Sequence, residues 1–277
     1  MSEAAFAEAP ERIVASPDGT RLAVFGLGEA APGTRPLLLV HGTSGDHRTW
    51  RVAGPILAQR RRLAAMDRRG RGDSGDGPAW AIEREVEDVA EVAERLAAEA
   101  GGPVDVVGHS LGGRLALAAA LASGAIRRAV VYEAVAAQSA AEAGLVAGLR
   151  ARLDAGDLDG LLSTFMTEAV GMPADDLAAF RANPIWQLRA AAGPTIVREL
   201  EAAIFAPALR LEVLAGVAQP VLQLVGSASP PWFLDGARVL DARLADGRLQ
   251  VIEGARHGAH HSHAAEFCRD VEAFLDA

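Results

Sequence analysis

VVGHSLGG, residues 106–113, contains the pattern Gly-x-Ser-x-Gly, with Ser110 between Gly108 and Gly112. An apolar run precedes the pattern and a helical run follows it, so Ser110 stands where a strand turns sharply into a helix. Glycine is needed on both sides because a Cβ atom would clash in so tight a turn. The turn exposes the Ser110 hydroxyl at a helix N-terminus, where negative charge is stabilised. Ser110 is therefore the candidate nucleophile.

Segments typical of strands and helices alternate around this motif, which predicts βαβ units and a mostly parallel sheet. Strands are expected at 35–42, 61–67, 104–108, 127–133, 220–226 and 248–254, helices at 82–100, 111–122, 232–245 and 264–276, and a hairpin near the N-terminus. Only helical patterns occur between about 136 and 215. We therefore predict a core domain of residues 1–134 and 216–277, with a helical cap, residues 135–215, inserted into it.

The composition excludes several classes of function. The net charge is −9, which argues against nucleic acid as a partner, and all 27 Lys and Arg residues are arginine, which excludes a phosphate-binding or Schiff-base lysine. Cys268 is the single cysteine, so a reducing compartment is expected. Neither a signal peptide nor a membrane span is indicated. These features predict a cytoplasmic, bacterial protein with no membrane partner and no cofactor.

An acyl-transfer site also needs donors for an oxyanion. One is the N–H of Leu111, directly after the nucleophile, and the second is expected from the loop after the strand LLLV. There Gly42 lets the backbone turn towards the site, so that Thr43 supplies the N–H.

Four segments in order, LLLVHG, MDRRGRGDSG, VVGHSLGG and IEGARHG, resemble the α/β-hydrolase fold family over about residues 35–277. The resemblance implies an eight-stranded, mostly parallel sheet flanked by helices, with a helical cap after strand six. It also implies that His257, after the last strand, is the general base. The nearby His260, His261 and His263 could suggest a metal, but a metal site would need further carboxylate or thiolate ligands, and the segment is more typical of a loop at the edge of the site, so none is expected.

The third member of a triad departs from the family pattern. The family places an Asp after the strand before last, where this chain has Ser229. Glu133 ends the strand that follows the nucleophile's strand and helix, 23 residues beyond Ser110 (133 − 110). Some haloalkane dehalogenases resemble this chain in placing a Glu there, so Glu133 is the predicted acid. The alternatives are Asp235, Glu253, or no carboxylate, with Ser229 and water in its place.

These residues predict a serine hydrolase that cleaves a carboxylic ester or lactone through an acyl-enzyme intermediate. Two alternatives remain, a lyase or C–C-cleaving relative of secondary metabolism and a catalytically silent binding protein. Phe165 and Trp186 in the cap, with Trp232, are the candidate substrate-binding residues and suggest a small apolar, ester-like substrate. The protein is expected to be a monomer or a homodimer.

Overall fold

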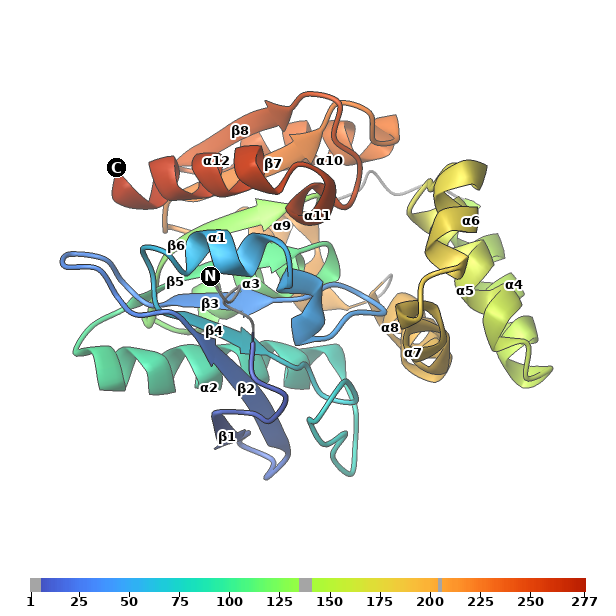
Figure 1. Ribbon diagram of the computed structural model, residues 1–277, viewed down its shortest axis with the longest axis horizontal. Helices are drawn as coiled ribbons and strands as arrows, with labels where there is room; N and C mark the ends of the chain where they lie inside the picture. Colours follow the sequence, from blue (N-terminus) through green and yellow to red (C-terminus); the bar gives the residue numbers. More distant parts are fainter. Residues whose placement is uncertain (1–5, 135–140, 204–205) are drawn as a thin grey trace.

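The computed structural model describes residues 6–134, 141–203 and 206–277. A single eight-stranded sheet forms its centre (Figure 1). The strands lie in the order β1 (Arg12–Ala15), β2 (Arg21–Leu27), β4 (Leu63–Met66), β3 (Leu37–Val40), β5 (Val104–His109), β6 (Ile126–Tyr132), β7 (Val221–Gly226) and β8 (Gly247–Ile252). The β1–β2 and β2–β4 pairs are antiparallel and all other pairs are parallel. The predicted α/β architecture is confirmed.

Helices cover both faces of the sheet because the central strands are apolar on both sides. In β3, Leu38 and Val40 belong to one core with α2 (Ile82–Ala100) and α3 (Leu111–Ala122). Leu37 and Leu39 point to the opposite core, which contains α1 (Ala53–Leu57) and α12 (Ala264–Asp276). The short helices η1 (His47–Trp50) and α11 (Ala259–Ser262) and the longer α10 (Pro231–Asp241) complete these layers.

Helix α2 shows why the loop after β4 is rich in arginine. Its apolar stripe is buried, and two of its carboxylates, Glu85 and Asp88, are buried with it. Arg68 Nε donates to Glu85 at 2.7 Å, and Arg69 Nε donates to Asp88 at 2.6 Å. Buried charges need such partners, so these two arginines hold the helix against the sheet.

Between β6 and β7 the chain forms a helical insertion, made of α4 (Ala141–Asp154), α5 (Leu158–Thr164), the π-helical turn η2 (Phe165–Ala169), α6 (Ala174–Arg181), α7 (Ile185–Ala191) and α8 (Gly193–Ala203). These helices have an apolar core of their own. They lie together at the side of the sheet towards which the parallel strands point (Figure 1). The insertion therefore stands over the strand ends that carry Ser110.

The segment after the insertion packs differently from the prediction. The turn η3 (Pro207–Leu209) and α9 (Leu211–Leu214) place Leu209 and Leu214 in the core beneath α3. Packing thus joins these residues to the sheet, although the sequence assigned them to the cap. The predicted cap boundary at residue 135 lies outside the described residues. In the described ranges, no helix has both the length and the apolar character needed to cross a membrane.

Candidate active site

Ser110 lies at a sharp turn between β5 and α3. Its backbone has φ 54° and ψ −127°, a conformation that costs free energy for a residue with a side chain. A Cβ atom on Gly112 would lie 2.3 Å from the carbonyl oxygen of His41, and one on Gly108 would lie 2.5 Å from the Cα of Gly113. Only glycine fits at both positions, which accounts for the spacing of the motif.

Glu133 follows the last residue of β6 and also has a positive φ, 45°. Its N–H donates to the carbonyl of Leu224 at 3.0 Å, and its side chain is buried. Carboxylate oxygen Oε1 accepts from the N–H of Gly226 at 2.8 Å, and Oε2 lies 2.6 Å from Nδ1 of His257. Both oxygens of this buried carboxylate therefore have partners.

His257 lies in the loop after β8 and is held from three sides. Glu133 contacts Nδ1, the ring of Phe233 stacks on the imidazole with centroids 4.6 Å apart, and the main-chain oxygen accepts from Nε2 of His109 at 2.8 Å. Because an ionised carboxylate only accepts hydrogen bonds, Nδ1 carries the proton. A proton held on Nδ1 leaves Nε2 as the nitrogen that can accept a proton, as a general base requires.

The loop after β3 approaches Ser110 closely. A Cβ on Gly42 would lie 2.9 Å from that of Ser110, so this loop needs a glycine. His41 fixes the loop from behind, since its Nδ1 donates to the carbonyl of Gly42 at 2.9 Å and its Nε2 accepts from the N–H of Arg68 at 3.1 Å. Burial lowers the pKa of His41 well below its usual range, so the ring is neutral and can make both bonds.

The other residues considered for the third position of the triad do not contact His257. The Oγ atom of Ser229 is buried without a hydrogen-bond partner among the described residues. Asp235 lies on α10 with an exposed side chain, 3.6 Å from Arg238. Glu253 is exposed just after β8. Among Glu133, Asp235 and Glu253, it is Glu133 that contacts His257.

Ser110, His257 and Thr43 line one cavity of about 530 Å³ beneath the helical insertion. Apolar side chains form one part of its wall (Phe165, Met166, Val170, Met172, Phe180 and Ile185), and charged residues, Arg51, Asp176, Arg189 and Arg256, also line it. Leu111 is the first residue of α3, so its N–H has no acceptor within the helix. The site thus combines a serine and a carboxylate-bound histidine in one cavity, with the N–H of Leu111 directly after the serine.

The sequence profile of the alpha/beta hydrolase family matches residues 37–270, most of the chain. The chain belongs to the alpha/beta hydrolase family.

Two solved structures are similar over nearly the whole length of the chain. An alpha/beta hydrolase from Sphaerobacter thermophilus is 29% identical, with a TM-score of 0.78, over 93% of this chain and 99% of that one. An esterase from Exiguobacterium antarcticum is 21% identical, with a TM-score of 0.74, over 96% and 99%. The second likeness, at this identity, shows the shared fold alone.

A curated relative matches over a much shorter length. The probable oxidoreductase EphD of Mycobacterium tuberculosis is 36% identical over 104 residues, which are 36% of this chain and 17% of that protein. This alpha/beta hydrolase therefore spans about a sixth of the relative's length.

Two of the three aromatic side chains expected at the substrate lie elsewhere in this alpha/beta hydrolase. Phe165 lines the cavity. Trp186 is buried in the core of the insertion, where its indole N–H donates to Asp159 at 2.8 Å. Trp232 is 37% exposed on α10. Neither tryptophan lines the cavity, because an apolar helical pattern does not reveal which neighbour its face packs against.

The histidines near His257 form part of the cavity wall. His260, His261 and His263 line it, and His260 packs on Trp50 with ring centroids 5.4 Å apart. Burial lowers the pKa of His260 well below its usual range, so its ring is neutral. Within the described ranges, no three His, Cys, Asp or Glu side chains gather closely enough to hold a metal ion.

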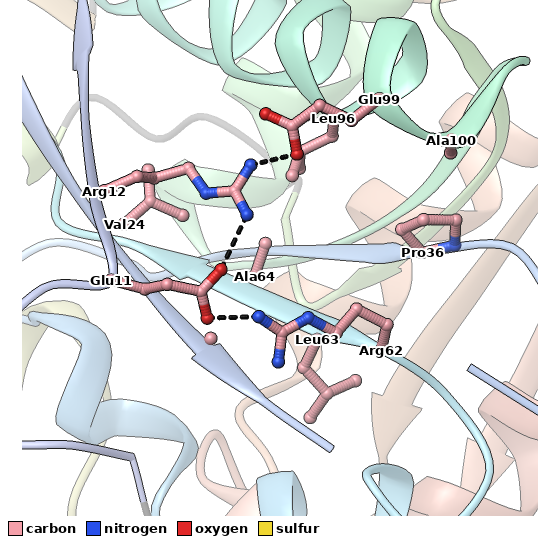
Figure 2. Close-up of a pocket in the computed structure, with 11 residues that line it drawn as sticks. Glu11, Arg12, Val24, Pro36, Arg62, Leu63, Ala64, Leu96, Glu99 and Ala100 are labelled. Atoms are coloured by element: carbon pink, nitrogen blue, oxygen red, sulfur yellow. Dashed lines mark hydrogen bonds and ion pairs between the residues drawn. The ribbon is translucent and has the colours of Figure 1, made fainter. Parts of the chain in front are cut away.

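A second, smaller cavity of about 180 Å³ lies at the opposite end of the parallel strands, where β3 and β4 begin (Figure 2). Its charged side chains neutralise one another: Arg12 pairs with Glu11 and Glu99, and Arg62 pairs with Glu11. This cavity is separate from Ser110 and holds none of the groups predicted to do chemistry.

Sequence reasoning missed Arg189, a buried cation of α7 that lines the main cavity. Nothing in the local pattern IWQLRAA distinguishes it from the chain's many surface arginines. It also missed the N–H of Gly226 as the second partner of Glu133.

Proposed function

We propose that this protein is a serine hydrolase that cleaves a carboxylic ester or a lactone through an acyl-enzyme intermediate. The observation that carries the proposal is the contact between Glu133 and Nδ1 of His257, in a cavity that His257 shares with Ser110. A fixed tautomer turns the imidazole into a base for the serine hydroxyl, which otherwise is a poor nucleophile.

In the proposed reaction, Nε2 of His257 takes the proton of Ser110 while Oγ attacks the ester carbonyl carbon. The resulting oxyanion is stabilised by the N–H groups of Leu111 and Thr43. Glu133 stabilises the imidazolium, which then protonates the leaving alcohol as the tetrahedral intermediate collapses to the acyl-enzyme. A water molecule, deprotonated by His257, attacks the acyl carbon and releases the carboxylic acid, which restores Ser110.

The surroundings of the three residues support this assignment. A nucleophilic carboxylate, which an alkyl-enzyme mechanism needs, does not occur at position 110. The apolar wall of the cavity suits the hydrocarbon part of an ester and excludes water from the charges that develop. The esterase of Exiguobacterium antarcticum, with the same fold, adds support from a relative.

The test combines a fluorophosphonate label with hydrolysis of p-nitrophenyl butyrate, using the wild-type protein and Ser110→Ala. Labelling at Ser110 together with ester turnover, both lost in Ser110→Ala, is the expected result. Labelling without turnover of this or other simple esters would favour a lyase or C–C-cleaving reaction. Absence of both would favour a binding protein and overturn the proposal.

A further inference from the structure

Arg189 is a buried cation in the wall of the cavity that contains Ser110. It belongs to α7 and is 8% exposed. The other buried arginines each form an ion pair with at least one carboxylate: Arg61, Arg68, Arg69 and Arg71. Arg189 forms none with any carboxylate in the described ranges, so the site holds a positive charge without a paired anion.

The guanidinium of Arg189 is held in place but not neutralised. Nη1 donates to the carbonyl of Ser44 at 2.5 Å, and Nη2 donates to Oγ1 of Thr49 at 3.2 Å. A guanidinium has five N–H donors, so these neutral acceptors leave most of its hydrogen-bonding capacity unused. The nearby Asp46 accepts from the backbone and the guanidinium of Arg48, and so is already paired.

The electrostatic surroundings of Arg189 also favour the binding of an anion. Burial lowers the pKa of Arg189, and neighbouring guanidiniums act in the same direction against the single carboxylate of Asp46. An arginine remains protonated even so. An anion arriving in the cavity would therefore relieve an unfavourable charge that the protein itself leaves uncompensated.

Arg189 and Ser110 lie on either side of the turn that runs from Gly42 to Gly45. Gly42 and Gly45 are joined by a hydrogen bond from the N–H of Gly45 to the carbonyl of Gly42, 3.1 Å long. A Cβ on Gly42 would lie 2.9 Å from that of Ser110, and one on Gly45 would lie 3.1 Å from Nη1 of Arg189. Because the ends of a β-turn are less than about 7 Å apart, Ser110 and the guanidinium lie against the two ends of one short turn, and both line the same cavity.

We propose that Arg189 binds a carboxylate of the substrate, so that the preferred ester carries an anion as well as the carbonyl that Ser110 attacks. Arginine suits this task because its planar fork matches the two carboxylate oxygens. The apolar side chains of Phe165 and Met166 would pack against the methylene groups between the two ends. This inference rests on the proposed function and adds a substrate class to it.

A purely structural role for Arg189 predicts a different result. Its bonds to Ser44 and Thr49 connect the helical insertion to the loop that carries Thr43. If the arginine served only to hold this loop, its loss would slow the hydrolysis of charged and neutral esters by the same factor. The ratio of the two rates separates the roles, and it does not depend on how much of a variant is folded.

The experiment measures kcat/KM for matched pairs of esters in a pH-indicator assay. Monoethyl glutarate and monoethyl adipate carry the carboxylate on the acyl side, and ethyl pentanoate and ethyl hexanoate are their neutral counterparts. The pair 4-acetoxybutanoate and butyl acetate tests the alcohol side. The wild type is expected to prefer the charged member of at least one series tenfold or more. Equal rates, or a preference for the neutral member in both series, would overturn the proposal.

The variants assign that preference to one side chain. Arg189→Met is expected to reduce the charged-to-neutral ratio at least tenfold, while Arg189→Lys retains part of it. Arg152→Met is the matched control, because Arg152 is an exposed arginine of the insertion that pairs with Asp157. It should keep the wild-type ratio. A ratio that survives in Arg189→Met would show that the side chain only holds the loop.

A binding measurement makes the inference independent of turnover. Adipate is expected to bind Ser110→Ala in isothermal titration calorimetry and to lose at least tenfold in affinity in Ser110→Ala/Arg189→Met. Equal affinity of the two proteins, or no binding to either, would contradict a carboxylate site at Arg189. If Ser110→Ala still hydrolyses esters, the proposed serine mechanism fails, and adipate binding still decides the role of Arg189.

Discussion

Replacing Glu133 by glutamine tests the proposed triad at its least conventional member. The two side chains have nearly the same shape, but the carboxylate accepts from both the N–H of Gly226 and Nδ1 of His257. The N–H of Gly226 can only donate, so it selects the amide oxygen of glutamine. The amide NH₂ group then faces Nδ1 and donates to it. His257 must therefore carry its proton on Nε2, the tautomer that cannot deprotonate Ser110.

The size of the effect follows from this tautomer change. The equivalent exchange of a buried Asp for Asn in serine proteases lowers kcat by about 10⁴. We expect a loss of about 10³ to 10⁴ in kcat for Glu133→Gln, with little change in KM, because Glu133 is buried behind His257. The assay is steady-state hydrolysis of p-nitrophenyl butyrate, with the rate of fluorophosphonate labelling as a second readout.

The control variants use the residues that the family pattern and the sequence offered as alternatives. Ser229→Ala and Asp235→Asn should retain kcat within about threefold, because neither side chain contacts His257. Circular dichroism and thermal melting confirm that Glu133→Gln is folded. Activity of this variant within threefold of the wild type, or a large loss in Ser229→Ala, would refute the assignment of the acid.

Two further predictions concern the backbone and the buried histidines. Gly112→Ala should destabilise the protein by several kcal/mol or abolish labelling of Ser110, because the new Cβ would lie 2.3 Å from the carbonyl oxygen of His41. Labelling and a denaturation midpoint like those of the wild type would show that the turn tolerates a side chain. Burial lowers the pKa values of His41, His109 and His260. Below about pH 6.5 the unfolded state therefore binds more protons than the folded state. The free energy of unfolding then decreases as the pH is lowered, by up to about 1.4 kcal/mol per pH unit for each histidine. Urea denaturation between pH 7.5 and 5 measures this slope, and a constant midpoint would mean that these rings are protonated in the fold.

Local patterns predicted the secondary structure well where one face of an element is apolar. The helix 82–100 was expected from its stripe of apolar residues and has those bounds in the structure. The same reasoning failed for Trp186, because periodicity shows that a face is buried and not what it is buried against, and Trp232 lies on an exposed part of α10. Arg189 escaped prediction for a related reason. The acceptor that fixes it, Ser44, is 145 positions away in the chain.

Glu133 could be proposed as the acid from the sequence because an absence and a presence coincided. The expected Asp was missing at position 229, and a carboxylate stood without explanation at the end of a core strand. What the sequence could not supply is the second contact of that carboxylate. Gly226 is the last residue of β7, and a Cβ there would lie 2.2 Å from the carbonyl oxygen of Ala255. This glycine lets the loop before His257 approach the sheet while its own N–H holds Glu133.

The strand register explains how a carboxylate that follows β6 can contact a histidine that follows β8. His109 pairs with Tyr132, and these are the last residues of two neighbouring parallel strands, so Ser110 and Glu133 come directly after them. Both have positive φ, and their N–H groups continue the sheet's hydrogen bonds to Tyr132 and Leu224. Each strand thus turns away from the sheet at the same level and directs a side chain over its edge. From β6 the carboxylate must cross the end of β7 to reach His257, and it does so over Gly226, where no side chain stands in the way. The position of the acid therefore depends on a glycine one strand away as much as on Glu133 itself.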